Sequence, residues 1–568
     1  MKRTLLSFIV IMFISSIVLA ACSQKQQEPE PPKESSDANQ EQAEDPASFD
    51  PLGKYETPVT ITQVLSYRPP EEQDALKGVT PETNAYLKDL KEMMNIDLKY
   101  LWSVPMDQYA EKFSLSIASG DLPDMMMVDQ ATFLNFVRQG LVADLSEVYE
   151  NYASPTLKRV IESDGGLALQ ATTVDGKVMG LTTSFQSAVQ LAYIRADWLK
   201  NLNLPVPKTM EEFEAVAEAF VKNDPDMNGE NDTYGFAMNK NFLVGAWAFD
   251  ARGIFYSHQS YPGGWIKGQD GTLLPGEIQP GTKEALTKLQ DWYKRGIIDR
   301  EFALKDENKV SEDIVAGRVG ITLGEWWVPN WPLNLSKDNN PNAEWIAVPL
   351  PEVGGESAKT LISPTLNAIM VVNKKYKQPE VAVKLANYYL EMRKPKYIDK
   401  SSPDYKGADS GYIYNWFEPR FIYPNYLDDA FIAVNEALDK GQTDIQIPED
   451  FLAAGEAAQF FNESKKFMDN KKDNAAWGFY YSRVAKEGGF GLSKKALDDK
   501  QFIQNEFYGT QTPTQLERGG SLNKLMAETF TKIVMGEDID QFDKFVESWK
   551  TLGGNDITDE VNEWYKGK

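Results

Sequence analysis

Four oxygen-bearing side chains recur at alternating positions within residues 224–232. They are Asp224, Asp226, Asn228 and Asp232. They occupy positions 1, 3, 5 and 9 of the segment, and position 6 is Gly229. Ca²⁺ binds carboxylate and amide oxygens at such spacing, with a glycine at the sharp turn and a backbone carbonyl at position 7. Position 7 here is Glu230, so the segment predicts a structural Ca²⁺ site with these five ligands.

This predicted calcium loop departs from an EF-hand loop at its last position. Position 12 is Gly235, where an EF-hand has a bidentate glutamate. Water or a residue distant in the sequence must therefore complete the ligand set. A helix predicted to end near Val221 would favour the cation, because the carboxyl end of a helix is partially negative. The alternative is an acidic turn held by Asn and Asp side chains.

The single cysteine, Cys22, follows a segment typical of secretion. Lys2 and Arg3 precede an apolar run over residues 5–19 that is short for a membrane span, and small residues lead up to the cysteine. A lone thiol cannot form an internal disulfide. The order resembles the lipobox of bacterial lipoproteins, which implies that residues 1–21 are a signal peptide and that Cys22 is lipidated. The alternative is an ordinary signal peptide in which Cys22 has no role.

Residues 22–57 are expected to form a disordered tether. The stretch from Ser23 to Asp50 is rich in Gln, Glu, Pro and Ser, and it has no aromatic residue before Phe49. Such a composition buries too little apolar surface to offset the entropy of ordering. A flexible coil of this length would span roughly 30 Å between a lipid and a folded domain.

Composition excludes several kinds of chemistry. The chain has one histidine, His258, which is expected on the surface, so most zinc sites and most nucleophilic dyads are excluded. We find no P-loop, nucleophile elbow or His-Glu-x-x-His motif. A net charge of −25 argues against nucleic acid and against unassisted binding to an anionic membrane. Aromatic residues are plentiful, with 13 Trp and 25 Tyr, and these side chains can stack on sugar rings.

Short apolar runs alternate with helical patterns from Val59 onward. Strands are predicted at 59–65, 96–102 and 125–128, with amphipathic helices between them. This alternation favours βαβ units and a mostly parallel sheet, whose ligands lie beyond the carboxyl ends of the strands. The candidate ligand contacts that follow these strands are Tyr67, Arg68 and Asp129. Solvated loops are the alternative.

Helix signals continue in the middle of the chain. Thr209 and Glu212 form a capping box ahead of an apolar face, and the helix predicted over residues 282–295 is closed by Gly296. Residues 315–324 and 362–372 are strand candidates.

Several motifs along the chain resemble those of one family. Their positions are 118–124, 175–181, 193–199, 317–321, 326–327 and 560–564. In this order and together with the Cys22 motif they are similar to the lipoprotein branch of the family 1 extracellular solute-binding proteins. Those proteins are receptors of carbohydrate ABC importers and relatives of maltose- and alginate-oligosaccharide-binding proteins. The resemblance covers the chain from about residue 57 to its end.

The resemblance implies an α/β fold of the periplasmic-binding-protein type, with two lobes joined by crossing strands and a ligand cleft between them. The length after residue 57 also predicts two lobes, because it exceeds one ordinary core. The first lobe is expected to contain residues 58–185 and about 363–425. The second is expected to contain residues 186–362 and about 426–568, including the calcium loop. Crossings are expected at 182–192, near Ser363 and within 395–430. Alginate-binding relatives often carry an acid directly after position 9 of the loop, where this chain has Thr233.

The resemblance also implies which residues line the cleft. The segment 317–327 is similar to the part of maltose-binding proteins that ends in a sugar-stacking tryptophan, so Trp326 or Trp327 should face the cleft beside Glu325. Adjacent residues at a strand end cannot both face one way, so one should stack and the other pack. Further candidates are Ser184, Phe185 and Gln186 on the first crossing, and Trp247, Trp265 and Trp416 elsewhere. Core packing is the alternative for each tryptophan.

The expected function is therefore that of a lipid-anchored, extracytoplasmic substrate-binding component of an ABC importer, which captures an oligosaccharide and is not an enzyme. Its partners would be the oligosaccharide, the transmembrane subunits of the permease, and the membrane through the lipid anchor alone, with the protein itself a monomer. One alternative is an extracellular glycoside hydrolase, which would use a pair of carboxylates. Another is a sugar-sensing lipoprotein without transport. The family resemblance and the tether favour the importer component.

Overall fold

The computed structural model describes residues 50–67, 80–82, 84–186, 188–243, 248–395 and 419–567. The chain divides into a unit of residues 1–48 and a unit of residues 49–568, and the described residues all belong to the second. The Cys22 motif and most of the predicted tether lie outside the described residues, as do Arg68, Trp247 and Trp416. Among the described residues, no helix combines the length and the apolar composition needed to cross a bilayer.

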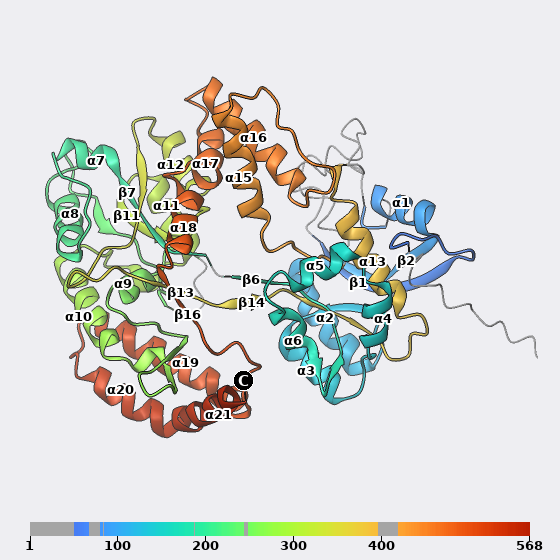
Figure 1. The fold of residues 1–568 in the computed structure, drawn as a ribbon. Helices are drawn as coiled ribbons and strands as arrows, with labels where there is room; N and C mark the ends of the chain where they lie inside the picture. Colours follow the sequence, from blue (N-terminus) through green and yellow to red (C-terminus); the bar gives the residue numbers. More distant parts are fainter. Residues whose placement is uncertain are drawn as a thin grey trace, which may run out of the picture. The chain divides into compact units, whose positions relative to one another are not determined.

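The first lobe is built on short strands covered by helices (Figure 1). β1 (Val59–Tyr67) pairs in parallel with β2 (Ile96–Pro105), and β3 (Met125–Val128) pairs antiparallel with β15 (Ile369–Val372). Their side chains pack with those of the helices, and Ile61, Phe133 and Leu385 are fully buried in this lobe. The helices of this lobe are α1 (Ala85–Met94), α2 (Met106–Ser119), α3 (Gln130–Arg138), α4 (Ser146–Tyr152), α5 (Pro155–Glu162), α6 (Leu167–Thr172) and α13 (Glu380–Glu391). The minor hairpin is β4 (Thr173–Val174) with β5 (Lys177–Val178).

The second lobe contains a four-stranded sheet in the order β12-β7-β11-β8. These strands are β12 (Trp345–Val348), β7 (Leu191–Arg195), β11 (Val319–Gly324) and β8 (Tyr234–Phe236). Along β7, alternate side chains enter two different hydrophobic clusters: Ala192 and Ile194 enter one, Leu191 and Tyr193 the other. Successive strand residues point to opposite faces, so this sheet is covered on both sides.

The expectation of a mostly parallel sheet is wrong for the second lobe. β11 is parallel to β8, but β7 is antiparallel to both β11 and β12. A short strand buried on both faces shows a continuous apolar run, and such a run does not encode the direction of its partner.

Helices surround the second-lobe sheet. α10, α19, α20 and α21 gather in one part of the lobe (Figure 1), and their apolar faces, including Trp292 and Phe530, join one cluster. The helices are α7 (Ala196–Asn201), α8 (Met210–Lys222), α9 (Arg252–Ser257), α10 (Pro280–Arg295), α11 (Glu307–Val315), α12 (Leu333–Asn339), α18 (Gly489–Asp498), α19 (Pro513–Val534), α20 (Gln541–Trp549) and α21 (Asn555–Lys566). The short turns are η4 (Gly276–Ile278), η5 (Phe302–Leu304), η6 (Val328–Asn330) and η9 (Lys550–Gly554), and the minor strands are β9 (Trp265–Lys267) and β10 (Leu273–Pro275).

Two segments pass from one lobe core to the other and pair with each other. β6 (Ser184–Gln186) is antiparallel to β14 (Pro364–Leu366), with Phe185 opposite Thr365. On the first segment Leu181 packs in the first lobe and Leu191 in the second. On the other, Ile362 packs in the second lobe and Ile369 in the first. These positions agree with the crossings expected at 182–192 and near Ser363. Beside them, β13 (Thr360–Ile362) pairs in parallel with β16 (Phe502–Gln504).

Three helices after residue 425 form a cluster of their own. They are α15 (Tyr426–Asp439), α16 (Ala454–Asp469) and α17 (Asn474–Arg483). Their shared core includes Val434 and Phe460, whereas Leu452, just before α16, packs with the first-lobe core. α17 also lies against α12 and η6 of the second lobe. The expected third crossing within 395–430 falls largely outside the described residues.

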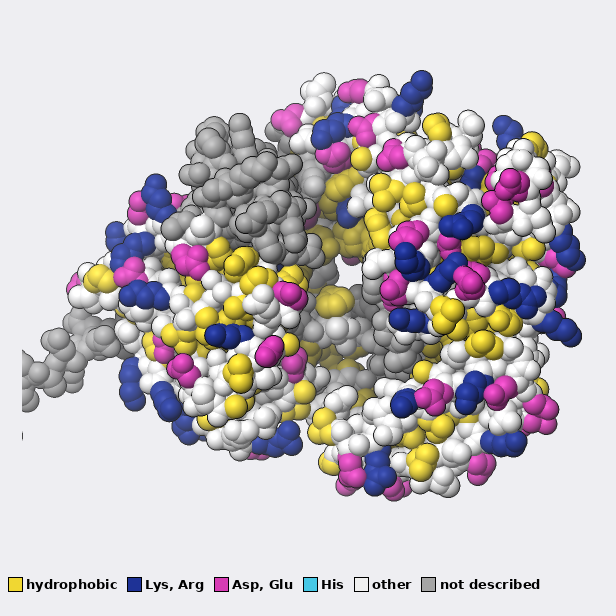
Figure 2. Space-filling view, turned by 180° about the vertical axis from the view of Figure 1, so that it is seen from behind, with side chains coloured by type: hydrophobic (Ala, Val, Ile, Leu, Met, Phe, Trp, Pro, Cys, Tyr) yellow, Lys and Arg dark blue, Asp and Glu magenta, His cyan; other side chains and the backbone are white. Residues whose placement is uncertain are grey.

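Charged side chains of both signs are interspersed on the face seen in Figure 2. Lys and Arg lie next to Asp and Glu there rather than forming a continuous basic surface.

Candidate ligand and metal sites

Glu325, Trp326 and Trp327 follow the carboxyl end of β11, a strand whose residues are all buried. The Tyr193 hydroxyl on β7 donates a hydrogen bond to the Glu325 carbonyl oxygen at 2.8 Å, which fixes the backbone at this point. The chain turns sharply into η6, and a Cβ on Gly324 would lie 2.5 Å from a methyl carbon of Val328. A residue larger than glycine would therefore disturb the turn that presents these three side chains.

The two tryptophans have different surroundings, as expected for adjacent residues at a strand end. Trp327 stacks on Trp331 with ring centroids 6.4 Å apart, and it packs against the second-lobe core. Trp326 is partly exposed, as Trp327 is, and it meets the edge of Phe490 at 6.3 Å and the guanidinium of Arg483 at 5.0 Å. Because Trp327 packs against the second-lobe core and Trp326 belongs to none of the hydrophobic clusters of the described residues, Trp326 is the better candidate to stack on a ligand.

A network of polar side chains lies beside these tryptophans. The Trp327 Nε1 donates to the Glu325 carboxylate at 3.3 Å. Burial raises the pKa of the Glu325 carboxyl, and the positive charge of Arg252 opposes that rise. Arg252 pairs with Asp250 at 2.6 Å, and the Gln190 side-chain amide donates to the same carboxylate at 2.8 Å.

One acceptor of this network has no partner among the described residues. The Gln190 Oε1 is enclosed and receives no hydrogen bond there. An unpaired buried acceptor costs roughly 1–3 kcal/mol, so this oxygen is an unfavourable feature of the network. Sequence reasoning missed Gln190, Asp250 and Arg252 as site residues. Gln190 alone had a signal, because it lies inside the expected first crossing.

The first crossing places its three candidate residues in different environments. Ser184 is buried, and its hydroxyl donates to the Asp164 carboxylate of the first lobe at 2.5 Å. This hydrogen bond already uses the proton of the hydroxyl. Asp164 also accepts the backbone N–H groups of Gly166 and Ala168. Phe185 is 43% exposed on β6 and is available to a ligand. Gln186 is the last residue of this strand.

The first-lobe candidates are less exposed to ligand than their positions suggested. Tyr67 ends β1 and packs partly against the first-lobe core. Asp129 is exposed at the end of β3, but its carboxylate caps α3 by accepting the Thr132 backbone N–H at 2.8 Å. The structure records no contact of either side chain with the Glu325 network.

Two expectations for single residues are wrong. Trp265 is 7% exposed and lies edge-on to Phe507 in the second-lobe core, so it is not a ligand stacker. His258 is not on the surface: its side chain is 8% exposed, and its Nδ1 lies 3.6 Å from a Glu284 carboxylate oxygen. Trp265 follows a turn and His258 is the C-cap of α9, and neither local sequence reveals whether distant elements cover the side chain.

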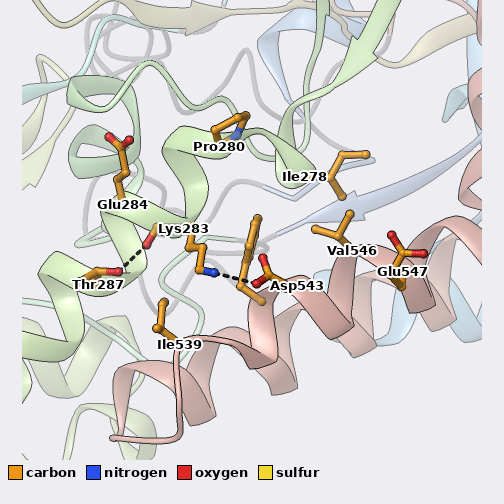
Figure 3. A pocket seen from close by; sticks show the side chains of 10 residues that line it. Ile278, Pro280, Lys283, Glu284, Thr287, Ile539, Asp543, Val546 and Glu547 are labelled. Carbon is orange, nitrogen blue, oxygen red and sulfur yellow. Dashed lines mark hydrogen bonds and ion pairs between the residues drawn. The ribbon is translucent and has the colours of Figure 1, made fainter.

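A separate pocket of about 660 Å³ lies between η4, α10 and α20 (Figure 3). Lys283 of α10 pairs with Asp543 of α20 at 2.7 Å, and the apolar side chains of Ile278 and Val546 lie to one side of this pair. None of the predicted ligand contacts lines this pocket.

In the predicted calcium loop, Asn228 lies at the centre of a hydrogen-bond network. Backbone N–H groups of Asn228 and Gly229 donate to the Asp224 carboxylate at 3.1 and 3.0 Å. The Asn228 amide donates to Asp226 at 3.0 Å and to Asp232 at 3.3 Å. Hydrogen bonds through residues 228–229 therefore connect the side chains at positions 1, 3, 5 and 9. Glu230 contributes its backbone N–H, which donates to the Asn228 side-chain oxygen at 2.6 Å.

The electrostatics of this loop fit a cation. The Asp226 Oδ1 is enclosed and has no hydrogen-bond partner among the described residues. Burial, contact with the Asp224 carboxyl and the charge of Asp232 raise the pKa of Asp226, so like charges are held close together. The described residues nevertheless contain no group of three or more His, Cys, Asp or Glu side chains gathered closely enough to hold a metal by themselves. Carbonyl, amide or water oxygens would have to complete such a ligand set.

The missing glutamate at position 12 has a structural reason. Gly235 lies in β8 against the backbone of α8, and a Cβ there would come within 2.3 Å of the Ala217 carbonyl oxygen. No side chain can occupy this position without separating the helix from the strand. The loop therefore resembles an EF-hand loop over its first nine positions only.

Comparison with known proteins identifies one family. The family model described as bacterial extracellular solute-binding protein matches residues 70–394. Lipoprotein LipO of Bacillus subtilis is 24% identical over 487 residues, which cover 84% of this chain and 88% of LipO. The polygalacturonan/rhamnogalacturonan-binding protein YtcQ of the same organism is 24% identical over 492 residues, covering 86% and 89%. The fructooligosaccharide ABC transporter substrate-binding protein FusA of Streptococcus pneumoniae is 27% identical over 316 residues, 53% of each chain.

Solved structures share the fold. An HMO-binding, ABC-transporter-associated solute-binding protein from Bifidobacterium longum infantis superimposes with a TM-score of 0.61 at 16% identity, over 89% of this chain and 98% of its own. The alginate-binding protein AlgQ2, in a structure without calcium ion, gives a TM-score of 0.56 at 16% identity, over 91% and 99%. At these identities the likeness establishes the two-lobe α/β architecture.

Proposed function

Because this chain belongs to the bacterial extracellular solute-binding protein family, we propose that it captures an oligosaccharide outside the cytoplasmic membrane and delivers it to an ABC importer. The family match carries the proposal. The relatives YtcQ and FusA support a carbohydrate ligand by their names, and FusA supports the connection to an ABC transporter. The ligand would be bound and released without cleavage.

The strand-end cluster offers a sugar suitable contacts. A sugar ring has an apolar face of C–H groups and a rim of hydroxyls, so it needs an aromatic surface and polar partners together. Trp326 supplies a partly exposed indole, and Phe185 an exposed ring on the crossing. Glu325, which is partly exposed beside Trp326, supplies an acceptor for hydroxyl groups. Each hydroxyl bonded there avoids the cost of burying it unpaired.

Two further proposals concern the anchor and the metal. Cys22 is the lipid attachment point, supported by the signal-like segment before it and by the lipoprotein name of LipO. The segment 224–232 holds Ca²⁺ as a structural ion, supported by the convergent oxygens and the unpartnered Asp226 Oδ1. The side chains of Asp224, Asp226, Asn228 and Asp232 and the Glu230 carbonyl would hold it, and it would neutralise the repulsion among the carboxylates.

A binding assay with the soluble part of the chain, residues 23–568, tests the main proposal. Calorimetry against a panel of neutral and acidic oligosaccharides should give a dissociation constant in the micromolar range or below for at least one sugar. Small-angle scattering should show a more compact particle with that sugar, because the lobes close on it. Chromatography of the sugar after incubation should show no cleavage products. A panel without any binder, or a sugar that is cleaved, would refute the proposal.

A further inference from the structure

Arg483, the last residue of α17, lies among aromatic rings. Its guanidinium carbon is 4.3 Å from the ring centre of Phe479, 5.0 Å from that of Trp326 and 6.0 Å from that of Phe460. Its recorded hydrogen bond runs from Nη1 to the Ser482 hydroxyl at 2.7 Å. In the described part of the chain, no carboxylate forms an ion pair with this arginine.

Other shielded arginines of the chain do contact a carboxylate. Arg195 pairs with Asp197 and Arg252 with Asp250, each at 2.6 Å, and Arg393 pairs with Glu456. The charge of Asp250 raises the pKa of the Arg252 guanidinium. Burial instead lowers the pKa of Arg483 to about 10, and only Tyr426 opposes that change. A shielded cation without a counter-ion among the described residues is unfavourable, and an anionic ligand would complete the site.

The contacts of Arg483 leave its donors available. The N–H groups of a guanidinium lie in its plane, so rings that cover its faces leave the edge free for a planar acceptor. The side chain is partly exposed, and none of its nitrogens is among the fully enclosed, unpartnered atoms. The donors that Ser482 does not use can therefore be reached by a ligand.

We propose that Arg483 and Trp326 form a subsite for a uronate residue, so that the captured sugar is an acidic oligosaccharide. The indole covers the apolar face of the ring, and the guanidinium donates two parallel hydrogen bonds to the oxygens of the ring carboxylate. This inference rests on the proposed function and narrows its substrate class. A carboxylate on the sugar also explains why a cation is retained here: the chain carries a net charge of −25, and an anionic ligand needs a local positive partner.

The test compares acidic sugars with their neutral esters. Oligomers of galacturonate, mannuronate and glucuronate are each titrated into the protein beside the same oligomer with every carboxylate methyl-esterified. Esterification removes the charge and keeps the ring. We expect at least one acid to bind at least about tenfold more tightly than its ester, the scale of a charged hydrogen bond. The inference is overturned if no acid binds better than its ester.

Three variants assign the preference to Arg483. Arg483→Met keeps an apolar stem among the rings and should make the acid bind no better than its ester, while ester affinity stays within about twofold. Arg483→Lys keeps the charge without the fork and should retain part of the preference. Arg300→Met is the matched control, because Arg300 also lies over an aromatic ring, 5.1 Å from the centre of Tyr293, but away from Trp326. It should bind like the wild type.

The outcomes separate this inference from the proposed function. If neutral oligosaccharides bind and acidic ones do not, the solute-binding function stands and the uronate subsite is refuted. If the acid preference survives in Arg483→Met, the anion is recognised elsewhere and the subsite is refuted. If a sulfated neutral sugar binds better than every uronate, the substrate class is wrong. If no sugar binds at all, both proposals fail. Should Arg483→Met not fold, Arg483→Lys and the wild-type ratio of acid to ester still decide the matter.

Discussion

Neighbouring tryptophans at the end of β11 have different physical roles. Trp327 contributes its ring to the interior beside Trp331 and its indole N–H to Glu325. Trp326 uses only part of its ring surface for its contacts with Arg483 and Phe490. Trp326 is therefore the one of the two indoles that lies outside the hydrophobic clusters of the described residues, and we assign it to the ligand.

Alanine substitutions at these two positions should separate ligand binding from stability. Trp326→Ala should weaken binding of the captured oligosaccharide by about 2–4 kcal/mol, the scale of an aromatic anchor, with a small change in unfolding free energy. Trp327→Ala should lower the free energy of unfolding by on the order of 3 kcal/mol, because it removes packed volume. Calorimetry and denaturant unfolding of both variants measure the two effects. If both variants bind like the wild type, other aromatic residues build the site.

The choice between these residues could not be made from the sequence. Their position at a strand end was foreseeable, but which ring faces outward depends on Trp331, Phe490 and α17, and these reach the site only through the fold. Gln190, Asp250, Arg252 and Arg483 were missed for the same reason. They come from three separate segments, around Gln190, Asp250–Arg252 and Arg483, and no spacing along the chain connects these segments.

Helix ends were predicted correctly from local sequence patterns, whereas constraints that arise from tertiary packing were not. The capping box of Thr209 and Glu212 is present as predicted, and Gly296 closes α10 with a positive φ of 76°. These devices are local, so the sequence specifies them. Gly235 is different, because its constraint comes from packing against the Ala217 backbone. The direction of the β7 pairs escaped prediction for the same reason.

Calcium should stabilise the fold through this loop. A metal that binds only the native state adds on the order of 3 kcal/mol at a hundredfold excess over its dissociation constant. Chelation should therefore lower the melting temperature, and Asp226→Ala should abolish the response to added Ca²⁺ while leaving sugar binding intact. Differential scanning calorimetry and elemental analysis measure both effects.

A matched control for the loop is Asp270→Ala. Asp270 is also an exposed turn aspartate, and it accepts hydrogen bonds from the backbone and the hydroxyl of Thr272. This variant should keep the full calcium response. A metal-free protein whose melting temperature ignores both chelator and Ca²⁺ would show that the loop is an acidic turn.

At the scale of the whole molecule, the sequence predicted two lobes, their discontinuity and the two crossings described here. Chain length and the family resemblance were sufficient for that, because each lobe needs its own core. The helices α15–α17 were less predictable. They share a cluster of their own, and their contacts reach Leu452 beside one core and α12 beside the other.

Attachment to the membrane is also a property of the whole molecule, and substitution of Cys22 tests it. Replacing Cys22 with Ala should move the protein from the membrane fraction to the culture fluid or the soluble fraction, because the variant lacks the thiol to which we propose the lipid is attached. Cell fractionation followed by immunoblotting measures the shift. A processed variant that stays with the membrane would place the anchor elsewhere.

The pairing of β3 with β15 has a consequence for the order in which the protein can fold. β3 ends at Val128, and its partner begins at Ile369, so the first lobe cannot complete its sheet until that distant segment is present. The four-stranded sheet of the second lobe needs only residues between Leu191 and Val348. During synthesis, which proceeds from the N-terminus, the four-stranded sheet of the second lobe can therefore form first. Until residues 369–372 are synthesised, the edge of β3 that pairs with them stays unpaired. Forming a contact between residues so far apart in the sequence is slow, but the entropy cost of closing a loop grows only slowly with its length. The separation of β3 from β15 should therefore affect the folding rate more than the free energy of unfolding.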